Sequence, residues 1–115
     1  MPPMIACEQG DIVLVVFAFT DESGDKRRPA VILSTSDYHR NRQEAIIAAI
    51  TSNVDRVLCG DHLIAGWREA GLLWPSTATG IIRTVKRSMI ERRLGKMPAA
   101  DMEAIRGQLR RVLAL

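Results

Sequence analysis

The sequence predicts a mainly β fold with α structure (α+β), in which a small antiparallel barrel or twisted sheet carries a C-terminal helix. Several short runs rich in β-branched and apolar residues, separated by turn-forming residues, predict the strands. One clear amphipathic pattern at helical spacing, near the end of the chain, predicts the helix. The length of 115 residues suits one domain, spanning 1–115, with its own core.

The first two strands are expected to flank a long loop. Residues 11–19, DIVLVVFAF, are apolar almost throughout, which is typical of a strand covered on both faces. Residues 20–28, TDESGDKRR, contain turn formers and predict a loop longer than a tight hairpin needs. Residues 29–36, PAVILSTS, predict the second strand, with Pro29 at its start or at a sheet edge because proline has no N–H for the ladder.

The middle of the chain predicts further strands between irregular segments. Residues 37–43 are polar and indicate a loop. Residues 44–52, EAIIAAITS, predict a strand because the apolar run is short and has turn residues on both sides. Residues 56–64 predict a straight or bent strand with a kink or bulge at Gly60.

The following segments alternate in the same way. Residues 66–78 indicate irregular structure or a short helical turn that ends at Pro75. Residues 79–87, TGIIRTVKR, predict another strand, and residues 88–97, SMIERRLGKM, are compatible with a short helix.

Residues 97–115 predict the C-terminal helix. Pro98 suits its first turn, and Gly107 weakens it by about 1 kcal/mol relative to Ala, which indicates close packing there. The apolar face consists of Met102, Ile105, Leu109 and Val112.

Composition argues against several classes of function. No window approaches the roughly 20 apolar residues of a membrane span, and the N-terminus lacks a signal-peptide layout, so we expect a cytoplasmic protein without a membrane partner. The sequence has Cys7, Cys59, His39 and His62, but neither metal-ligand spacing nor a nucleophile motif connects them. We therefore expect reduced cysteines, no metal site and no cofactor.

Basic residues crowd the second half of the chain, which has a net charge of +3 overall. This distribution is compatible with nucleic-acid binding, although a solvated surface explains it equally well. Aromatic residues make up 4% of the chain, so charge and backbone contacts are expected to contribute more to any RNA affinity than stacking. The basic residues are Arg83, Lys86, Arg87, Arg92, Arg93, Lys96, Arg106, Arg110 and Arg111.

The stretch GDKRRPAVIL, residues 24–33, brings two arginines to the start of an apolar strand. A residue before proline is restricted to extended backbone, so Arg28 is held more rigidly than Arg27 and makes a better receptor for an anion such as phosphate. The alternative is a structural arginine that pairs with a carboxylate such as Asp11.

Hydroxyl side chains form two further candidate groups. Thr51 and Ser52 end an apolar strand, where they can contact a ligand or simply bond to nearby backbone. Ser76 and Thr77 follow Trp74 in a segment that is either an RNA-facing edge or a plain turn.

In their order along the chain, these segments resemble the MazF/PemK family of toxins from bacterial type II toxin–antitoxin pairs. The resemblance covers nearly the whole chain. The segments that carry it are GDIVLVVF, RRPAVILS, AIIAAITSN, GLLWPSTA, IIRTVKRSMI, RRLGKM and DMEAIRGQLRRVL.

The resemblance implies an SH3-like barrel of the CcdB/PemK type that forms a homodimer. It also implies a metal-independent endoribonuclease that cleaves single-stranded RNA, inhibits translation and growth, and is neutralised when the C-terminal segment of a cognate antitoxin covers its groove. In the family, the arginine of the RP motif and a Thr or Ser that closes the third main strand form the active site. These positions correspond to Arg28 and Thr51, the implied catalytic residues.

The remaining site residues follow from the same frame. Where some relatives have an Arg/Asp pair, the segment STATGIIRT has hydroxyls, which leaves the general acid and base unassigned. The candidate RNA-binding residues are Lys26, Arg27, Ser52, Asn53, Ser76, Thr77 and Arg83.

Two other functions are compatible with this fold. One is a toxin that inhibits a protein target such as gyrase; it would use particular aromatic residues in its C-terminal tail, whereas this chain ends in VLAL. The other is a non-catalytic nucleic-acid-binding module, which the missing Arg/Asp pair favours.

Overall fold

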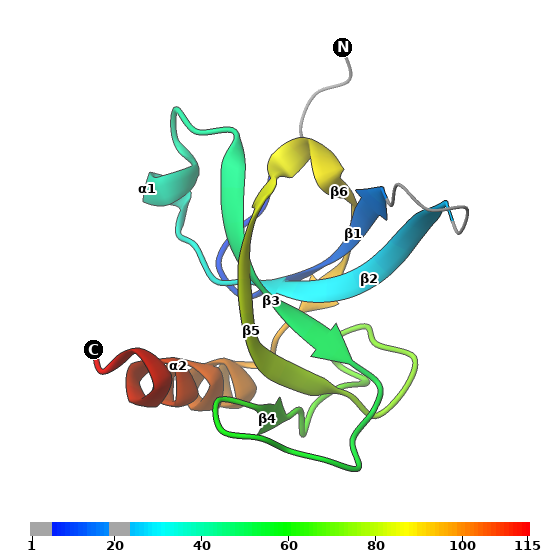
Figure 1. Ribbon diagram of the computed structural model, residues 1–115, viewed down its shortest axis with the longest axis vertical. Coiled ribbons are helices and arrows are strands. Elements are labelled where there is room, and N and C mark those ends of the chain that lie inside the picture. The colour runs from blue at the N-terminus through cyan, green and yellow to red at the C-terminus, as the bar shows by residue number, and fades with distance from the viewer. Residues whose placement is uncertain (1–5, 19–23) are drawn as a thin grey trace.

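An antiparallel sheet forms the body of the molecule, and helix α2 lies across its lower end in Figure 1. The structure is a computed structural model that describes residues 6–18 and 24–115. Within these residues the sheet has six strands in the order β4-β5-β3-β2-β1-β6. The strands are β1 (Asp11–Ala18), β2 (Asp25–Ile32), β3 (Glu44–Thr51), β4 (His62–Leu63), β5 (Thr77–Lys86) and β6 (Ile90–Lys96). The helical segments are α1 (Ser36–His39), the 3-10 turn η1 (Arg87–Met89) and α2 (Ala99–Leu113).

The predicted fold class is confirmed: the protein is mainly β with a C-terminal helix. Strands β1 and β3 and the last three residues of β2 contribute to both faces of the core, because their side chains enter two different hydrophobic clusters. Ile12 packs in the cluster beneath α2, whereas Val13 packs in the cluster on the other face of the sheet. This double burial explains the near-continuous apolar run of the first strand, as the sequence predicts. Its predicted last residue, Phe19, lies outside the described residues.

Strand β2 begins and ends earlier than the sequence predicts. Residues 25–28 belong to the strand and pair with β1, so the loop prediction is wrong there, while residues 20–23 lie outside the described part. Strand β3 joins β2 only from Ala30 onward. Pro29 thus lies inside the strand, at the point where pairing between β2 and β3 stops. The missing N–H of the proline is tolerated there because, among the described residues, the edge of β2 on that side has no partner strand.

Helix α1 takes the place of the first part of the loop predicted over residues 37–43 and of the end of the predicted second strand, whereas residues 40–43 are irregular as predicted. The chain leaves the sheet after Ile32, and the Thr35 side chain caps α1 by accepting a hydrogen bond from the Tyr38 backbone N–H at 3.3 Å. Strand β3 is confirmed to Thr51, and β5 is confirmed although it starts two residues early, at Thr77.

Strand β4 is much shorter than the strand predicted over residues 56–64. Gly60 lies in a turn with φ of +94°, which favours glycine, rather than at a kink or bulge within a strand. The irregular segment predicted over residues 66–78 is confirmed as far as residue 76 and consists largely of turns.

The short helix predicted over residues 88–97 is wrong. After η1, residues 90–96 form β6, which pairs antiparallel with β1 from Asp11–Lys96 to Val15–Ile90. Met, Glu, Arg and Leu favour helix locally, but β1 needs a hydrogen-bonding partner on the edge away from β2, and tertiary pairing outweighs that propensity.

The C-terminal helix is confirmed, with α2 burying Met102 and Ile105 against the sheet. Pro98 lies directly before its first residue. The prediction of close packing at Gly107 is wrong, because a Cβ added there would meet nothing within 4 Å.

Candidate functional site

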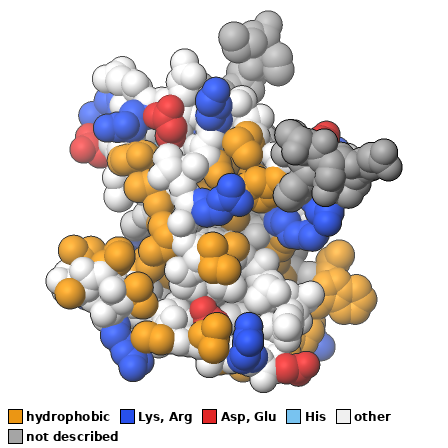
Figure 2. Space-filling model, viewed as in Figure 1, with side chains coloured by type: hydrophobic (Ala, Val, Ile, Leu, Met, Phe, Trp, Pro, Cys, Tyr) orange, Lys and Arg blue, Asp and Glu red, His pale blue; other side chains and the backbone are white. Residues whose placement is uncertain are grey.

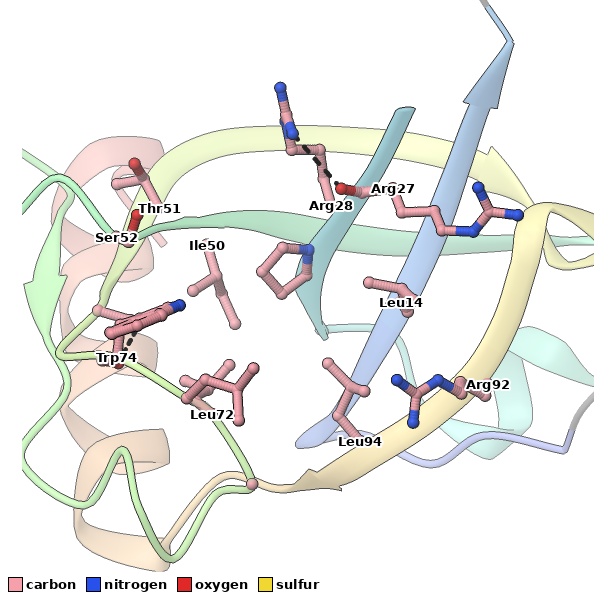
Figure 3. Close-up of a pocket in the computed structure, with 14 residues that line it drawn as sticks. Leu14, Arg27, Arg28, Ile50, Thr51, Ser52, Leu72, Trp74, Arg92 and Leu94 are labelled. Carbon is pink, nitrogen blue, oxygen red and sulfur yellow. Dashed lines mark hydrogen bonds between the residues drawn. The ribbon is translucent and has the colours of Figure 1, made fainter. Parts of the chain in front are cut away.

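A cleft of about 710 Å³ lies where the middle of β2 and the end of β3 face β6 and the segment before β5 (Figure 3). Among residues 6–18 and 24–115, its lining contains three arginines and no acidic residue. The arginines are Arg27, Arg28 and Arg92; the hydroxyl residues are Thr51, Ser52 and Ser76. The apolar residues between them are Leu14, Pro29, Ile50, Leu72 and Leu94, and the remaining lining residues are Gly71, Leu73 and Trp74.

The two arginines of β2 differ in their partners. The Arg27 Nε donates to Glu91 Oε1 on β6 at 2.9 Å, so its charge is partly balanced. Arg28 is exposed, and within the described residues its guanidinium has no carboxylate partner, only the Arg27 carbonyl oxygen at 3.4 Å. Figure 3 shows the two guanidiniums pointing in different directions from neighbouring positions of the strand. Arg28 is therefore the arginine of β2 whose charge is least satisfied by the protein itself.

Among the described residues, no carboxylate pairs with Arg28, and Asp11, the partner suggested by the structural alternative, is bound elsewhere. The carboxylate of Asp11 is buried and binds Arg93 Nε of β6 at 3.1 Å, and it also accepts the Glu8 backbone N–H at 2.9 Å. Asp11 is thus satisfied without Arg28.

The strand-end hydroxyls line the same cleft. Thr51 Oγ1 accepts a hydrogen bond from the Asn53 backbone N–H at 3.1 Å, so the side chain does bond to nearby backbone, one of the two alternatives from the sequence. Since the oxygen acts as the acceptor in that bond, its own hydrogen can still be donated to a ligand. Ser52 is exposed beside it, and Figure 3 shows both side chains at the same end of β3.

The other predicted RNA-binding residues lie at the edge of the cleft or outside it. Ser76 lines the cleft, but it is buried and its hydroxyl donates to the Trp74 carbonyl oxygen at 2.8 Å. Thr77 is fully buried and offers no surface to a ligand. Arg83 lies over the ring of Phe17, with 4.8 Å between the guanidinium carbon and the ring centre.

Lys26 and Asn53 do not line the cleft either. Lys26 lies on β2 opposite Phe17, two residues before Arg28. Asn53 forms a turn after β3, in which its side-chain oxygen accepts the Asp55 backbone N–H at 3.2 Å.

A sequence profile of the PemK-like, MazF-like toxins of type II toxin–antitoxin systems matches residues 8–113. The chain belongs to this family. No curated protein sequence matches the toxin.

Solved structures resemble the toxin along most of its length. MazF in a MazE–MazF crystal structure from Deinococcus radiodurans superposes with a TM-score of 0.80 at 20% identity, over 95% of this chain and 96% of that one. An endoribonuclease in complex with its cognate antitoxin from a mycobacterial species superposes with a TM-score of 0.75 at 18% identity, over 96% of this chain and 97% of that one. The Mycobacterium tuberculosis toxin MazF-mt6 superposes with a TM-score of 0.70 at 20% identity, over 90% of this chain and 97% of that one. At these identities the likeness shows that the toxin has the same fold.

Two lining residues with a charged or aromatic side chain, Arg92 and Trp74, are absent from the site that the sequence predicts. The sequence places Arg92 only among many basic residues, because the composition of residues 88–97 favours a helix and nothing local indicates their pairing with β1. Trp74 enters the prediction only as a neighbour of the Ser76 hydroxyl, and an aromatic residue next to a proline is a weak signal for a ligand contact.

A buried carboxylate fixes the chain ahead of the cleft wall. Asp101 at the start of α2 accepts hydrogen bonds from the backbone N–H groups of Ala65 and Gly66, at 2.8 and 2.9 Å, and contacts His62 Nε2 at 2.7 Å. Burial raises the pKa of Asp101, but the bonds from His62, Ala65 and Gly66 outweigh it and hold the pKa below its ordinary value of 3.8. The helix thereby fixes the turns at residues 65–71, which lead directly into the cleft wall.

The described residues contain no cluster of three or more His, Cys, Asp or Glu side chains that could hold a metal ion. Among those same residues, no helix combines the length and the hydrophobicity needed to span a membrane.

Proposed function

We propose that this toxin is an endoribonuclease that cleaves single-stranded RNA without a metal ion, by attack of the RNA's own 2′-hydroxyl. The observation that carries the proposal is that Arg28 and Thr51 line one cleft, in which none of the described lining residues is a carboxylate. A guanidinium and a hydroxyl donor on a shared concave surface can both hydrogen-bond one phosphodiester. The family membership and the endoribonuclease relatives described above support the same activity.

The chemistry needs few groups from the protein. The 2′-oxygen attacks the neighbouring phosphorus, the bond from phosphorus to the 5′-oxygen breaks, and the products are a 2′,3′-cyclic phosphate and a 5′-hydroxyl. The 2′-hydroxyl proton leaves and the 5′-oxygen gains a proton, so the reaction is balanced without a cofactor. The protein supplies geometry and positive charge for the phosphoryl oxygens. DNA lacks the 2′-hydroxyl, so it would bind but not be cut.

Arg28 and Thr51 take different roles in this scheme. The Arg28 guanidinium stabilises the negative charge that builds on the phosphoryl oxygens, and Thr51 donates its free hydrogen to a non-bridging oxygen. An arginine side chain is not deprotonated in proteins, so we assign protonation of the leaving oxygen to water rather than to Arg28.

The cleft also fits the partner expected from the family. We propose that the C-terminal segment of a cognate antitoxin, rich in acidic and apolar residues, covers the cleft and competes with RNA, and that the toxin acts as a homodimer. The arginines Arg27 and Arg92 would meet the acidic side chains of that segment, and the exposed Leu73 would meet its apolar ones. The relatives in complex with antitoxin support a partner of this kind.

Substitution of Arg28 tests the proposed function. Arg28→Ala is expected to slow cleavage of a mixed-sequence RNA in EDTA by at least about 100-fold, the loss seen when one oxyanion-stabilising donor is removed. The fold should be unaffected, because Arg28 is exposed and makes no ion pair within the described residues.

Arg40→Ala is the matched control. Arg40 is also exposed and basic, but it pairs with Asp37 on α1 and does not line the cleft. Cleavage by Arg28→Ala at the rate of the Arg40→Ala control would refute the mechanism. RNA binding without any cuts by the unmodified toxin would favour the non-catalytic module, and no RNA binding would favour a protein target.

A further inference from the structure

Trp74 is unusually exposed for a tryptophan in a folded globular protein. The residue is 66% exposed, and the neighbouring Leu73 is 81% exposed. Large apolar side chains that protrude together at the edge of a cleft mark a contact surface rather than a packing requirement. Figure 2 shows basic side chains on the side of the molecule where β2 lies, with exposed hydrophobic side chains below them.

The backbone that carries Trp74 is firmly held although its side chain is exposed. Its carbonyl oxygen accepts the Ser76 hydroxyl at 2.8 Å, and the Ser76 carbonyl oxygen accepts the Ile64 backbone N–H at 2.9 Å. On the other side, the Leu72 backbone N–H donates to the Trp67 carbonyl oxygen at 3.0 Å. An indole with two rotatable side-chain bonds on a fixed backbone loses little freedom when a ligand contacts it.

The surroundings of Trp74 match the two halves of a nucleotide. In Figure 3 the indole lies on the same side of the cleft as Ser52, Arg92 lies on the opposite side, and Leu72 lies between them. An apolar floor between an indole and a set of guanidiniums accommodates a flat base and an anionic phosphate at the same time. The described lining residues include no carboxylate that would repel the phosphate.

We propose that Trp74 stacks on a base that flanks the scissile phosphodiester and thereby contributes affinity for single-stranded RNA. This inference rests on the proposed function, because it assigns Trp74 to the binding of the same substrate. Trp74 takes no part in bond breaking. Stacking on one base is worth about 1–3 kcal/mol, so stacking contributes more here than the low aromatic content of the sequence suggests.

Binding of uncleavable single strands tests the stacking. Affinities are measured for an oligodeoxythymidylate and for an abasic deoxyribose-phosphate oligomer of equal length, with the unmodified toxin, Trp74→Leu and Trp74→Phe. Trp74→Leu should weaken binding of the base-containing strand by about 5- to 150-fold and leave the affinity for the abasic strand unchanged. Trp74→Phe should keep most of the affinity for the base-containing strand that Trp74→Leu loses.

Fluorescence gives a second readout with a matched control. The sequence has two tryptophans, Trp67 and Trp74. The emission should be quenched when Trp67→Phe binds oligodeoxythymidylate, because Trp74 alone then reports, and the quench should be absent in Trp74→Phe. In RNA cleavage, Trp74→Leu should raise KM and change kcat by less than about 3-fold.

Several results would overturn the stacking while leaving the nuclease intact. One is that Trp74→Leu binds both oligomers as tightly as the unmodified toxin while Arg28→Ala still slows cleavage by at least about 100-fold. Another is an equal loss for the base-containing and abasic strands, which would place Trp74 against the backbone. A third is unchanged nucleic-acid binding with lost inhibition by antitoxin, which would assign Trp74 to the protein partner.

Discussion

Single ion pairs decide which arginines of the cleft are available to a ligand. Arg92 and Arg93 are neighbours on β6, yet their environments differ completely. Arg93 binds the buried carboxylate of Asp11 at 3.1 Å, whereas Arg92 lines the cleft and has no ion pair within the described residues. Because successive strand residues point to opposite sides of a sheet, one becomes structural and the other stays accessible.

This contrast predicts different consequences for two adjacent substitutions. Arg92→Gln should weaken binding of a single-stranded oligonucleotide and reduce the slope of log affinity against log salt concentration by about 0.7, the value for one lost phosphate contact on a single strand. Arg93→Gln should leave that slope unchanged and instead destabilise the fold by about 1–3 kcal/mol, because it leaves the Asp11 carboxylate short of a partner.

Affinity titrations between low and physiological salt, together with urea unfolding of both variants, measure the two effects. An unchanged slope for Arg92→Gln would show that this side chain does not contact a phosphate.

At the scale of secondary structure, the cleft wall depends on direct contact between two backbones. A Cβ on Gly95 of β6 would lie 2.0 Å from the Ala70 carbonyl oxygen, and a Cβ on Gly71 would lie 2.3 Å from the Leu94 carbonyl oxygen. The turn that leads into Leu72 is thus pressed against β6 with no room for a side chain. Gly71 also has a φ of +86°, which L side chains rarely adopt.

This contact predicts opposite effects for two Gly→Ala substitutions. Gly95→Ala should destabilise the toxin by about 2–4 kcal/mol and lower RNA cleavage, because the turn must move and displaces the wall that carries Leu72 and Trp74. Gly107→Ala is the matched control: Gly107 lies in α2 with nothing near its would-be Cβ, so alanine should stabilise by about 0.5–1 kcal/mol.

Thermal unfolding and cleavage rates of the two variants compare these outcomes. Equal stability of Gly95→Ala and the unmodified toxin would mean that the backbone contact can relax without cost.

The elements that sequence predicts well are those whose burial pattern is local. Residues 11–18 and 44–51 are apolar on both faces of a strand, and α2 has one apolar face, so their patterns identify them without knowledge of neighbours. Residues 90–96 and 25–28 form strands because β1 lies beside them, and their own composition is polar. Of the predicted site, Arg28, Thr51, Arg27, Ser52 and Ser76 line the cleft, whereas Trp74 and Arg92 required the topology that brings β6 and residues 71–76 together.

In the whole molecule, two buried polar clusters hold helical segments to the sheet. Asp101 connects α2 to β4 and the following turn. On the other side, His39 of α1 lies buried between the Ser34 hydroxyl at 2.6 Å and the Cys7 carbonyl oxygen at 3.1 Å. Burial lowers the pKa of His39; the hydrogen bond to Cys7 opposes this, and the nearby Arg87 guanidinium adds to it, so the net pKa lies below the ordinary 6.5.

Both clusters make the toxin more stable at neutral pH than in acid. A histidine with a lowered pKa binds fewer protons in the folded than in the unfolded state, so its contribution is complete above pH 6.5 and decreases as the pH falls below that value. Asp101 also has a lowered pKa, so its contribution is complete above pH 3.8 and is lost as the pH falls through its folded value. The free energy of unfolding should therefore decline in two separate acid ranges.

Urea unfolding between pH 8 and pH 3 separates the two contributions. His39→Gln should be less stable than the unmodified toxin at pH 8 but lose less stability between pH 7 and pH 5, because no imidazole remains to take up a proton in the unfolded chain. Asp101→Asn should be destabilised by about 2–4 kcal/mol at neutral pH, since the His62 ring and two backbone N–H groups lose a charged acceptor, and should lose the decline below pH 4. A His39→Gln curve parallel to that of the unmodified toxin between pH 7 and pH 5 would show that the buried imidazole does not control acid stability.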